Sequence, residues 1–230
     1  MTKLKSFFFA ASALTLVFIT ACSNAAQIPD AGTGGSAALP EAPFVEGGAS
    51  LILSPNKLNI KVKVTTSDGT PVTVEGCTET TLLSGTETVL HAQGTVVILK
   101  GKIIKLNCHN NQLTELNVQG LTALQSLGCS NNKLTALNVQ GLSALQHLKC
   151  GYNKLSADAL TKLFNDLPQR TVSQDAKCYL YTCHRHLGII EEEGNHKDFT
   201  SPGELKNAFD NAKTVKNWKM YKWDNGWGEL

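Results

Sequence analysis

The sequence predicts a mostly β solenoid with two short strands in each coil of 21 residues. The motif L-x-x-L-x-C-x-x-N-x-L, with Ile as its first residue in one case, recurs from Ile103, Leu124 and Leu145. The second half of the unit, L-x-x-L-x-V-x-x-L, repeats the apolar spacing of the first half and lacks the 3.6-residue period of a helix. Such a unit buries its apolar side only when successive coils stack on one another.

The first 22 residues are predicted to be a secretion signal and not part of the fold. Lys3 and Lys5 form a short basic region, and residues 7–20 are an apolar stretch. That stretch is too short for a comfortable membrane span, so the pattern is typical of a secretory signal. Residues 1–22 are therefore excluded from the folded part, and the protein is expected to be exported.

A cysteine follows the apolar stretch directly. The tetrapeptide ITAC, which ends at Cys22, resembles the lipobox of bacterial lipoprotein precursors. The resemblance implies that Cys22 is lipidated and anchors the protein to a membrane; an ordinary signal cleaved near Asn24 would instead leave a free secreted protein. Gly, Ala, Pro and Ser dominate residues 23–48, which predicts a flexible tether with a reach of about 25–30 Å.

Residues 49–102 are expected to form a β-rich N-terminal cap. They contain the strand-like segments LNIKVKV, TPVTVEG and TVVILKG, and Asp68-Gly69 is a turn signal between the first two. The segment from Thr95 also aligns with LNVQGLT from Leu116, which predicts a degenerate repeat at the end of this cap.

Residues 103–155 are the repeats themselves, and two kinds of side chain are expected to face inward. Alternation with polar neighbours places one leucine and one cysteine per coil on the inner side of a short parallel strand. These residues are Leu106, Leu127, Leu148, Cys108, Cys129 and Cys150. An asparagine follows each cysteine at a fixed offset, and we predict that it binds backbone groups of its own and a neighbouring coil, in preference to an exposed turn position. These asparagines are Asn111, Asn132 and Asn153.

Residues 156–230 are expected to form a small α/β C-terminal cap. Ser156 is a predicted N-cap of a helix that ends before Pro168, and Ser201 with Glu204 reads as the capping box of a second helix. KCYLYTC and KNWKMYKW are strand-like. The apolar stripes of the two helices are Leu160, Leu163, Phe164 and Leu167, and Leu205, Ala208, Phe209 and Ala212.

The repeated cysteines are predicted to pack in the core and not to bind zinc. A tetrahedral zinc site needs four ligands that converge on one point. Cysteines stacked one per coil lie in a line, about 4.8 Å apart, and parallel inward side chains rarely offer the dihedral angle of a disulfide. A buried thiol behaves as a small apolar group, so the column needs no further chemistry.

The remaining cysteines and histidines leave alternatives open. Cys77 is either buried or paired, and a bridge between Cys178 and Cys183 would require a turn between them. The segment CHRH, residues 183–186, together with His196 could bind a metal, although no acidic or cysteine partner has convincing spacing. We therefore predict no metal site and no cofactor.

Composition and motifs argue against an enzyme and against nucleic-acid binding. The net charge is +2, with 17% charged residues, so no strong basic surface is indicated. Neither a glycine-rich phosphate loop nor a nucleophile elbow occurs, and no Ser/His/Asp set stands out. The chain is expected to act by binding a protein partner, and through its lipid, a membrane.

The outward positions of the repeat strands form the predicted partner-binding face. They make three columns, Lys105, Ser126 and His147; Asn107, Gly128 and Lys149; His109, Ser130 and Gly151. Three strands span only about 15 Å, so a partner would also have to touch a cap. The aromatic residues Trp218, Tyr221, Trp223 and Trp227 either anchor such a partner or cover the open end of the coil, and we favour the cover.

The repeat motif resembles the leucine-rich repeat family, and the closest resemblance is to bacterial surface proteins of the spirochaete and oral-bacterial type. That resemblance is strong for residues 103–155. It implies an outer-membrane or surface adhesin that binds host matrix or other cells during virulence. The alternative is a periplasmic structural or assembly lipoprotein that contacts another envelope component.

Overall fold

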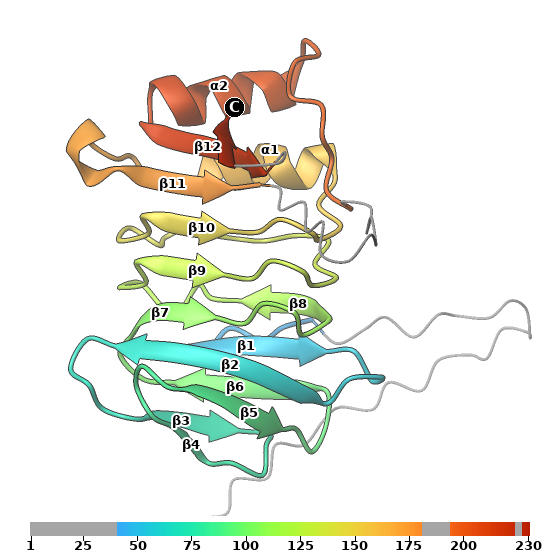
Figure 1. Cartoon of the computed structure of the whole chain (residues 1–230), viewed down its shortest axis with the longest axis vertical. Helices are drawn as coiled ribbons and strands as arrows, with labels where there is room; N and C mark the ends of the chain where they lie inside the picture. Colours follow the sequence, from blue (N-terminus) through green and yellow to red (C-terminus); the bar gives the residue numbers. More distant parts are fainter. Residues whose placement is uncertain (1–40, 181–193, 224–226) are drawn as a thin grey trace, which may run out of the picture. The chain divides into compact units, whose positions relative to one another are not determined.

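The computed structural model of the chain describes residues 41–180, 194–223 and 227–230. These residues form two β-sheets, and two helices lie at the C-terminal end (Figure 1). Strands β2 to β6 lie at the opposite end of the molecule, as Figure 1 shows. The longest run of parallel strands lies between these two ends.

The smaller sheet has five strands in the order β4-β3-β6-β1-β8, and every neighbouring pair in it is antiparallel. Its strands are β1 Gly48–Leu53, β3 Val72–Glu75, β4 Thr81–Leu82, β6 Val96–Lys100 and β8 Leu113–Asn117. All six residues of β1 are buried, and β6 and β8 pair with its two edges.

The larger sheet has eight strands in the order β13-β12-β11-β10-β9-β7-β2-β5. Its strands are β2 Asn59–Thr66, β5 Glu87–His91, β7 Ile103–Asn107, β9 Ser126–Gly128, β10 His147–Lys149, β11 Ala176–Tyr179, β12 Trp218–Trp223 and β13 Trp227–Glu229. Strands β7, β9, β10, β11 and β12 pair in parallel, while β2, β5 and β13 are antiparallel to their neighbours. The sheet is therefore mixed.

The prediction of a solenoid with two strands in every coil is wrong. The second half of the first repeat does form a strand, β8, but it pairs antiparallel with β1. The corresponding part of the second repeat contributes only the isolated bridge from Asn117 to Asn138. Leu134, Leu137 and Val139 are buried all the same, so the apolar spacing signalled burial without strand pairing. The resulting architecture is two sheets, one antiparallel and one mixed.

The expected degenerate repeat in the N-terminal region is also absent from the structure. The segment from Thr95 forms β6, which pairs antiparallel with β1 and β3 and does not stack in parallel on β7. The residues before β1 already contact this sheet. The amide of Ala42 donates to Glu115 Oε2 at 2.7 Å, and Ala42 is buried.

The helices cover the C-terminal end of the core, and their starts differ. Helix α1, Ala157–Asp166, begins as predicted, with the Ser156 hydroxyl accepting from the Ala159 amide at 3.2 Å. Helix α2, Glu204–Thr214, has Gly203 at its N-cap and no capping box. Ser201 instead donates its hydroxyl to Asp198, so the predicted box is wrong. A short 3-10 helix, Val172–Gln174, precedes β11.

The core is one apolar cluster that runs from the antiparallel strands to the helices. The buried stripes of both helices join it, except that Leu205 is only partly buried. Trp218, in the last of the parallel strands, is 1% exposed and donates its indole N–H to the Pro168 carbonyl at 2.8 Å, so it belongs to this core. Tyr221 is half-buried.

Candidate functional site

The parallel strands bring the predicted contact residues into register on one face. Lys105, Ser126 and His147 are direct neighbours across β7, β9 and β10. Asn107, Gly128 and Lys149 form the next column. Because paired residues of adjacent strands share a face of the sheet, both columns lie on the side opposite the buried leucines. We call this side the outer face.

Neighbouring strands extend the outer face beyond the repeats. Strand β2 pairs Thr65 with Lys105 and Lys63 with Asn107. On the other side, β11 adds Lys177 and Tyr179. Strand β12 then continues the columns with Lys219 and Tyr221. The alternation in NIKVKVTT signalled which residues of β2 are exposed, but no sequence pattern indicated that β2 lies beside β7.

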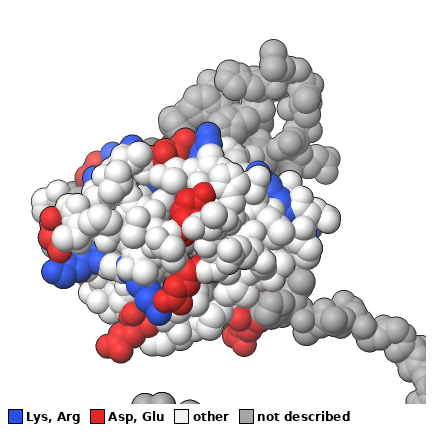
Figure 2. Space-filling model, turned by 90° about the horizontal axis from the view of Figure 1, so that it is seen from below, with Lys and Arg blue, Asp and Glu red and all other residues white. Residues whose placement is uncertain are grey.

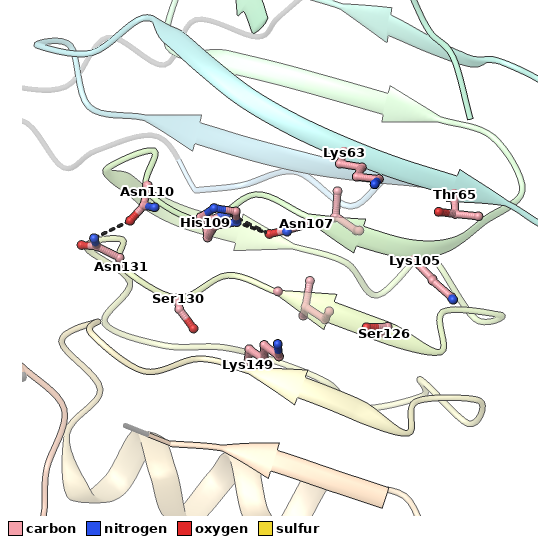
Figure 3. Close-up of a pocket in the computed structure, with 13 residues that line it drawn as sticks. Lys63, Thr65, Lys105, Asn107, His109, Asn110, Ser126, Ser130, Asn131 and Lys149 are labelled. Carbon is pink, nitrogen blue, oxygen red and sulfur yellow. Dashed lines mark hydrogen bonds between the residues drawn. The ribbon is translucent and has the colours of Figure 1, made fainter. Parts of the chain in front are cut away.

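A hollow of about 410 Å³ lies on the outer face where β2, β7, β9 and β10 meet. Figure 3 shows Lys63, Lys105 and Lys149 around it, each on a different strand. We call it the lysine hollow; its lining residues are Lys63, Thr65, Lys105, Leu106, Asn107, His109, Asn110, Ser126, Leu127, Gly128, Ser130, Asn131 and Lys149. None of them is acidic, and most carry a hydroxyl, amide or ammonium group.

Gly128 leaves the space that the hollow occupies. In the first and third repeats the same register position holds Asn107 and Lys149. A Cβ at position 128 would lie 3.0 Å from Asn107 Oδ1, so any side chain there would enter the hollow. Of the three equivalent positions 107, 128 and 149, only position 128 lacks a side chain, and this gap forms the hollow.

Hydrogen bonds hold the polar wall of the hollow in place. Asn107 Oδ1 accepts from the amide of His109, and the Nδ1 atom of the same histidine lies 2.5 Å from it. The amide group of Asn131 donates to Asn110 Oδ1, as the dashed lines in Figure 3 indicate. Asn110 and Asn131 both have positive φ, at 60° and 54°, a conformation that asparagine tolerates better than most residues.

The lysines of the hollow differ from most others on the larger sheet in having no acidic partner. Within the described parts of the chain, Lys63, Lys105 and Lys149 form no ion pair. Elsewhere, opposite charges lie side by side: Lys61 is 3.3 Å from Glu87 and Lys100 is 2.7 Å from Glu75. Figure 2, a view onto the β3–β4 end, shows basic and acidic residues mixed in this way.

Two effects lower the pKa of His147 on the outer face. Partial burial is the main cause that lowers the pKa of its imidazole, and the nearby ammonium groups of Lys177, Lys105 and Lys149 lower it further. Asp175 acts in the opposite direction. Lys149 Nζ also lies 5.3 Å from the centre of the Tyr179 ring, which stacks on Tyr221 at 5.1 Å. A cation over an aromatic ring is attracted by the ring quadrupole.

The inner side of the same strands carries the cysteines. Cys108, Cys129 and Cys150 are each 0% exposed and unbridged, which confirms core packing. Burial raises the pKa of the Cys108 thiol to about 12 and that of Cys129 well above its ordinary value. Cys77 and Cys178 are buried and unbridged as well.

The predicted asparagine contacts are confirmed. Asn132 Nδ2 donates to the carbonyls of Cys129 and Cys108, at 2.9 and 3.0 Å, and Asn153 repeats the pattern one repeat later. Asn195 continues it, donating to Cys150 and Leu180. We call Asn111, Asn132, Asn153 and Asn195 the asparagine ladder. Asn195 was missed because no repeat motif surrounds it.

Several predicted features lie outside the described residues. These are Cys22, Cys183 and the CHRH segment, and the side chains of Trp223 and Trp227 are not described either. Among the residues that the structure does describe, no group of three or more His, Cys, Asp or Glu side chains could hold a metal ion. In the same residues, no helix has the length and apolarity needed to cross a membrane.

No protein-family model matches the chain, and neither a curated protein nor a solved structure is significantly similar to it.

Proposed function

We propose that the chain is an exported, lipid-anchored binding module of the bacterial envelope whose outer face contacts a ligand on host matrix or on other cells. The observation that carries this proposal is the outer face itself. It aligns Lys105, Ser126 and His147 beside Asn107 and Lys149, all facing away from the core.

The size of the face supports binding of an extended ligand. From β2 to β12 the columns cross six strands, or about 29 Å at about 4.8 Å per strand. This exceeds the roughly 15 Å of the three repeat strands alone. Affinity from such a surface would come mainly from polar and charged contacts, since most of its side chains are lysines, histidines and small polar residues, with Tyr179 and Tyr221 at one end.

The anchor supports the location of the module. The ITAC segment that ends at Cys22 fits lipidation, and residues 23–40 would connect the lipid to the folded part. A flexible chain of that composition keeps a folded unit away from the membrane surface. Binding to distant ligands needs such a spacer.

Accessibility on intact cells tests the proposal. Protease added to whole cells should degrade the wild-type protein, and Cys22→Ala should release the protein from the membrane fraction. Cells that carry the wild-type protein should adhere to matrix-coated surfaces better than cells with Cys22→Ala. Protection from external protease until the outer membrane is breached would contradict an adhesive role and favour a periplasmic assembly lipoprotein.

A further inference from the structure

We propose that the lysine hollow binds an acidic polysaccharide, with Lys63, Lys105 and Lys149 holding its carboxylate or sulfate groups. This inference rests on the proposed function, because it names the ligand class of the same outer face. It depends on four observations: the charge of the hollow, the neutral groups that line it, the side chains it lacks and its shape.

The positive charge of the lysine hollow favours a negatively charged ligand. Three ammonium groups border the hollow, and none of its lining residues is acidic. In the described part of the chain these three lysines have no ion-pair partner, whereas Lys61 on the same face of β2 pairs with Glu87. Unpaired cations gathered around one depression create a local positive potential that attracts negative groups. A ligand anion would supply the missing partner.

The neutral lining suits sugar hydroxyls. Thr65, Ser126 and Ser130 carry hydroxyl groups, and Asn107 and Asn131 carry amides, so the wall offers both donors and acceptors. Hydroxyl groups of a sugar both donate and accept, and therefore match such a mixed wall better than a carboxylate-only ligand does.

The side chains that are absent argue against a peptide. Energetically dominant contacts in protein interfaces are enriched in Trp, Tyr and Arg. Among the lining residues there is no arginine, and the one aromatic ring is that of His109. The most exposed large apolar residues of the described chain, Phe44, Leu83, Val89, Val172 and Val215, are not among them either. The two leucines that line the hollow, Leu106 and Leu127, are at most 1% exposed, so a protein partner would find no exposed apolar side chain there.

The shape fits a short stretch of chain. The volume of about 410 Å³ falls within the range of about 300–1,000 Å³ typical of small-ligand sites. Lys63 and Lys149 belong to one column and are three strand intervals apart, or about 14 Å. Anionic groups that recur along a polymer could contact both lysines at once, and the open outer face lets the polymer continue on either side.

Binding assays on the purified full-length protein test this inference. The probes are oligogalacturonate, which carries carboxylates, dextran sulfate, which carries sulfates, unmodified dextran and poly-L-glutamate. We expect binding to one or both acidic polysaccharides, none to dextran, and weaker binding to poly-L-glutamate. Comparison of the first two identifies the anion. Equal or tighter binding of poly-L-glutamate, or no binding to either acidic polysaccharide, would overturn the proposal.

Charge-matched variants separate the hollow from general basicity. Lys63→Gln, Lys105→Gln and Lys149→Gln should each weaken binding about fivefold, and binding should become less dependent on salt. Lys61→Gln removes the same charge from the same face of β2 but outside the hollow, and should change affinity less than twofold. Equal losses from Lys61→Gln and Lys63→Gln would overturn the assignment.

A variant without a change of charge tests whether the ligand occupies the lysine hollow. Gly128→Asn introduces the residue that the first repeat has at this position and fills the hollow without a change of charge. It should weaken binding by about tenfold or more while the far-UV circular dichroism stays that of the wild type. As a spectroscopic readout, the ligand should raise the pKa of His147 in an NMR titration. The binding assays use purified protein, so they test the ligand class and do not depend on whether cells expose the protein. The protease test on whole cells examines that exposure separately, and its result does not depend on whether the hollow binds a polysaccharide.

Discussion

The side-chain amide of Asn132 donates to the carbonyl of Cys108, 24 residues earlier in the chain, at 3.0 Å. The same amide group donates to Cys129 at 2.9 Å. One asparagine therefore joins two consecutive repeats at the point where the chain leaves the parallel sheet. Strand pairing ends there, so these carbonyls need another donor in the buried interior.

Replacement of Asn132 by alanine tests the asparagine ladder. Its Oδ1 also accepts from the amides of Asn111 and Leu113, at 3.1 and 2.9 Å, so Asn132→Ala leaves several buried backbone groups unpaired. Each such group costs about 1–3 kcal/mol. We expect the free energy of unfolding in urea to fall by at least about 2 kcal/mol.

Asn138 provides the control for that experiment. Its Oδ1 accepts only a local bond from Gln140 at 3.0 Å, and its side chain is half-buried. Asn138→Ala should lower the free energy of unfolding by less than about 1 kcal/mol. If both substitutions have the same effect, the ladder does not contribute specifically to stability.

Cys108, Cys129 and Cys150 form a buried column, so we expect their thiols not to react in the folded protein. Burial raises the pKa of Cys108 to about 12, so the thiolate that attacks alkylating agents is scarce at about pH 8. Native protein treated with iodoacetamide should remain unlabelled at Cys108 and Cys129 in site-resolved mass spectrometry. Labelling should follow unfolding in urea, and labelling without urea would show that the column opens.

A polar replacement in the column should destabilise the fold. Cys129 is 0% exposed, and its sulfur lies 3.5 Å from the Lys149 carbonyl. Cys129→Ser places a more strongly hydrated hydroxyl in that site, and we expect a loss of about 1–3 kcal/mol in the free energy of unfolding. Cys129→Ala, which removes the sulfur without adding a polar group, separates desolvation from loss of volume.

The sequence period predicted the middle of the fold well, for a physical reason. A fixed interval of 21 residues means that equivalent residues stack, so the inward cysteines, the asparagine contacts and the outer columns all followed from the position of Cys129. The period could not predict how many strands each repeat forms. Leu137 and Val139 are buried without a strand around them, whereas the equivalent Leu116 and its neighbours form β8 because β1 lies beside them.

The candidate site was predicted only in part. Lys105 and Lys149 were expected on the outer face, but Lys63 comes from β2, whose pairing with β7 joins residues about 40 positions apart. No local pattern encodes that pairing. Gly128 was recognised as a member of its column, although the hollow above it depends on the larger side chains on either side. Contacts between distant segments therefore complete a surface that the repeat alone leaves open.

The lowered pKa of the Asp175 carboxyl predicts how the stability of the protein depends on pH. Hydrogen bonds from the ammonium groups of Lys177 and Lys219, at 2.6 and 2.8 Å, lower the pKa of its carboxyl to about 2. Because the pKa in the folded state lies below the ordinary value of 3.8, the stabilisation is present above about pH 4 and is lost as the pH falls toward 2.

The substitution Asp175→Asn removes this titration while it keeps the backbone conformation. Asp175 has φ of 48°, which asparagine tolerates as well as aspartate does. Between pH 4 and pH 2, the free energy of unfolding of the variant should fall less steeply than that of the wild type. Added salt should reduce the difference, since the groups are exposed. Parallel slopes in the two proteins would contradict the assignment.

Gly120 and Gly141 lie one repeat apart, and we expect alanine to destabilise the fold for a different reason at each position. Gly141 has φ of 82°, and a Cβ there would meet no atom within 4 Å. Gly141→Ala should therefore cost only the strain of a positive φ, about 1–2 kcal/mol. A Cβ at Gly120 would lie 1.7 Å from the carbonyl oxygen of Val45 and 2.9 Å from that of Gly48. Backbone atoms cannot give way as a flexible side chain can, so Gly120→Ala must displace the segment before β1.

Amide exchange distinguishes the two effects. The amide of Gly48 donates to Val45 at 3.1 Å, and the amide of Ala42 donates to Glu115. Both amides should lose protection from hydrogen exchange in Gly120→Ala and keep it in Gly141→Ala. The free energy of unfolding should also fall further in Gly120→Ala. Protection retained at both Gly48 and Ala42 in Gly120→Ala would mean that the chain before β1 does not pack against Gly120.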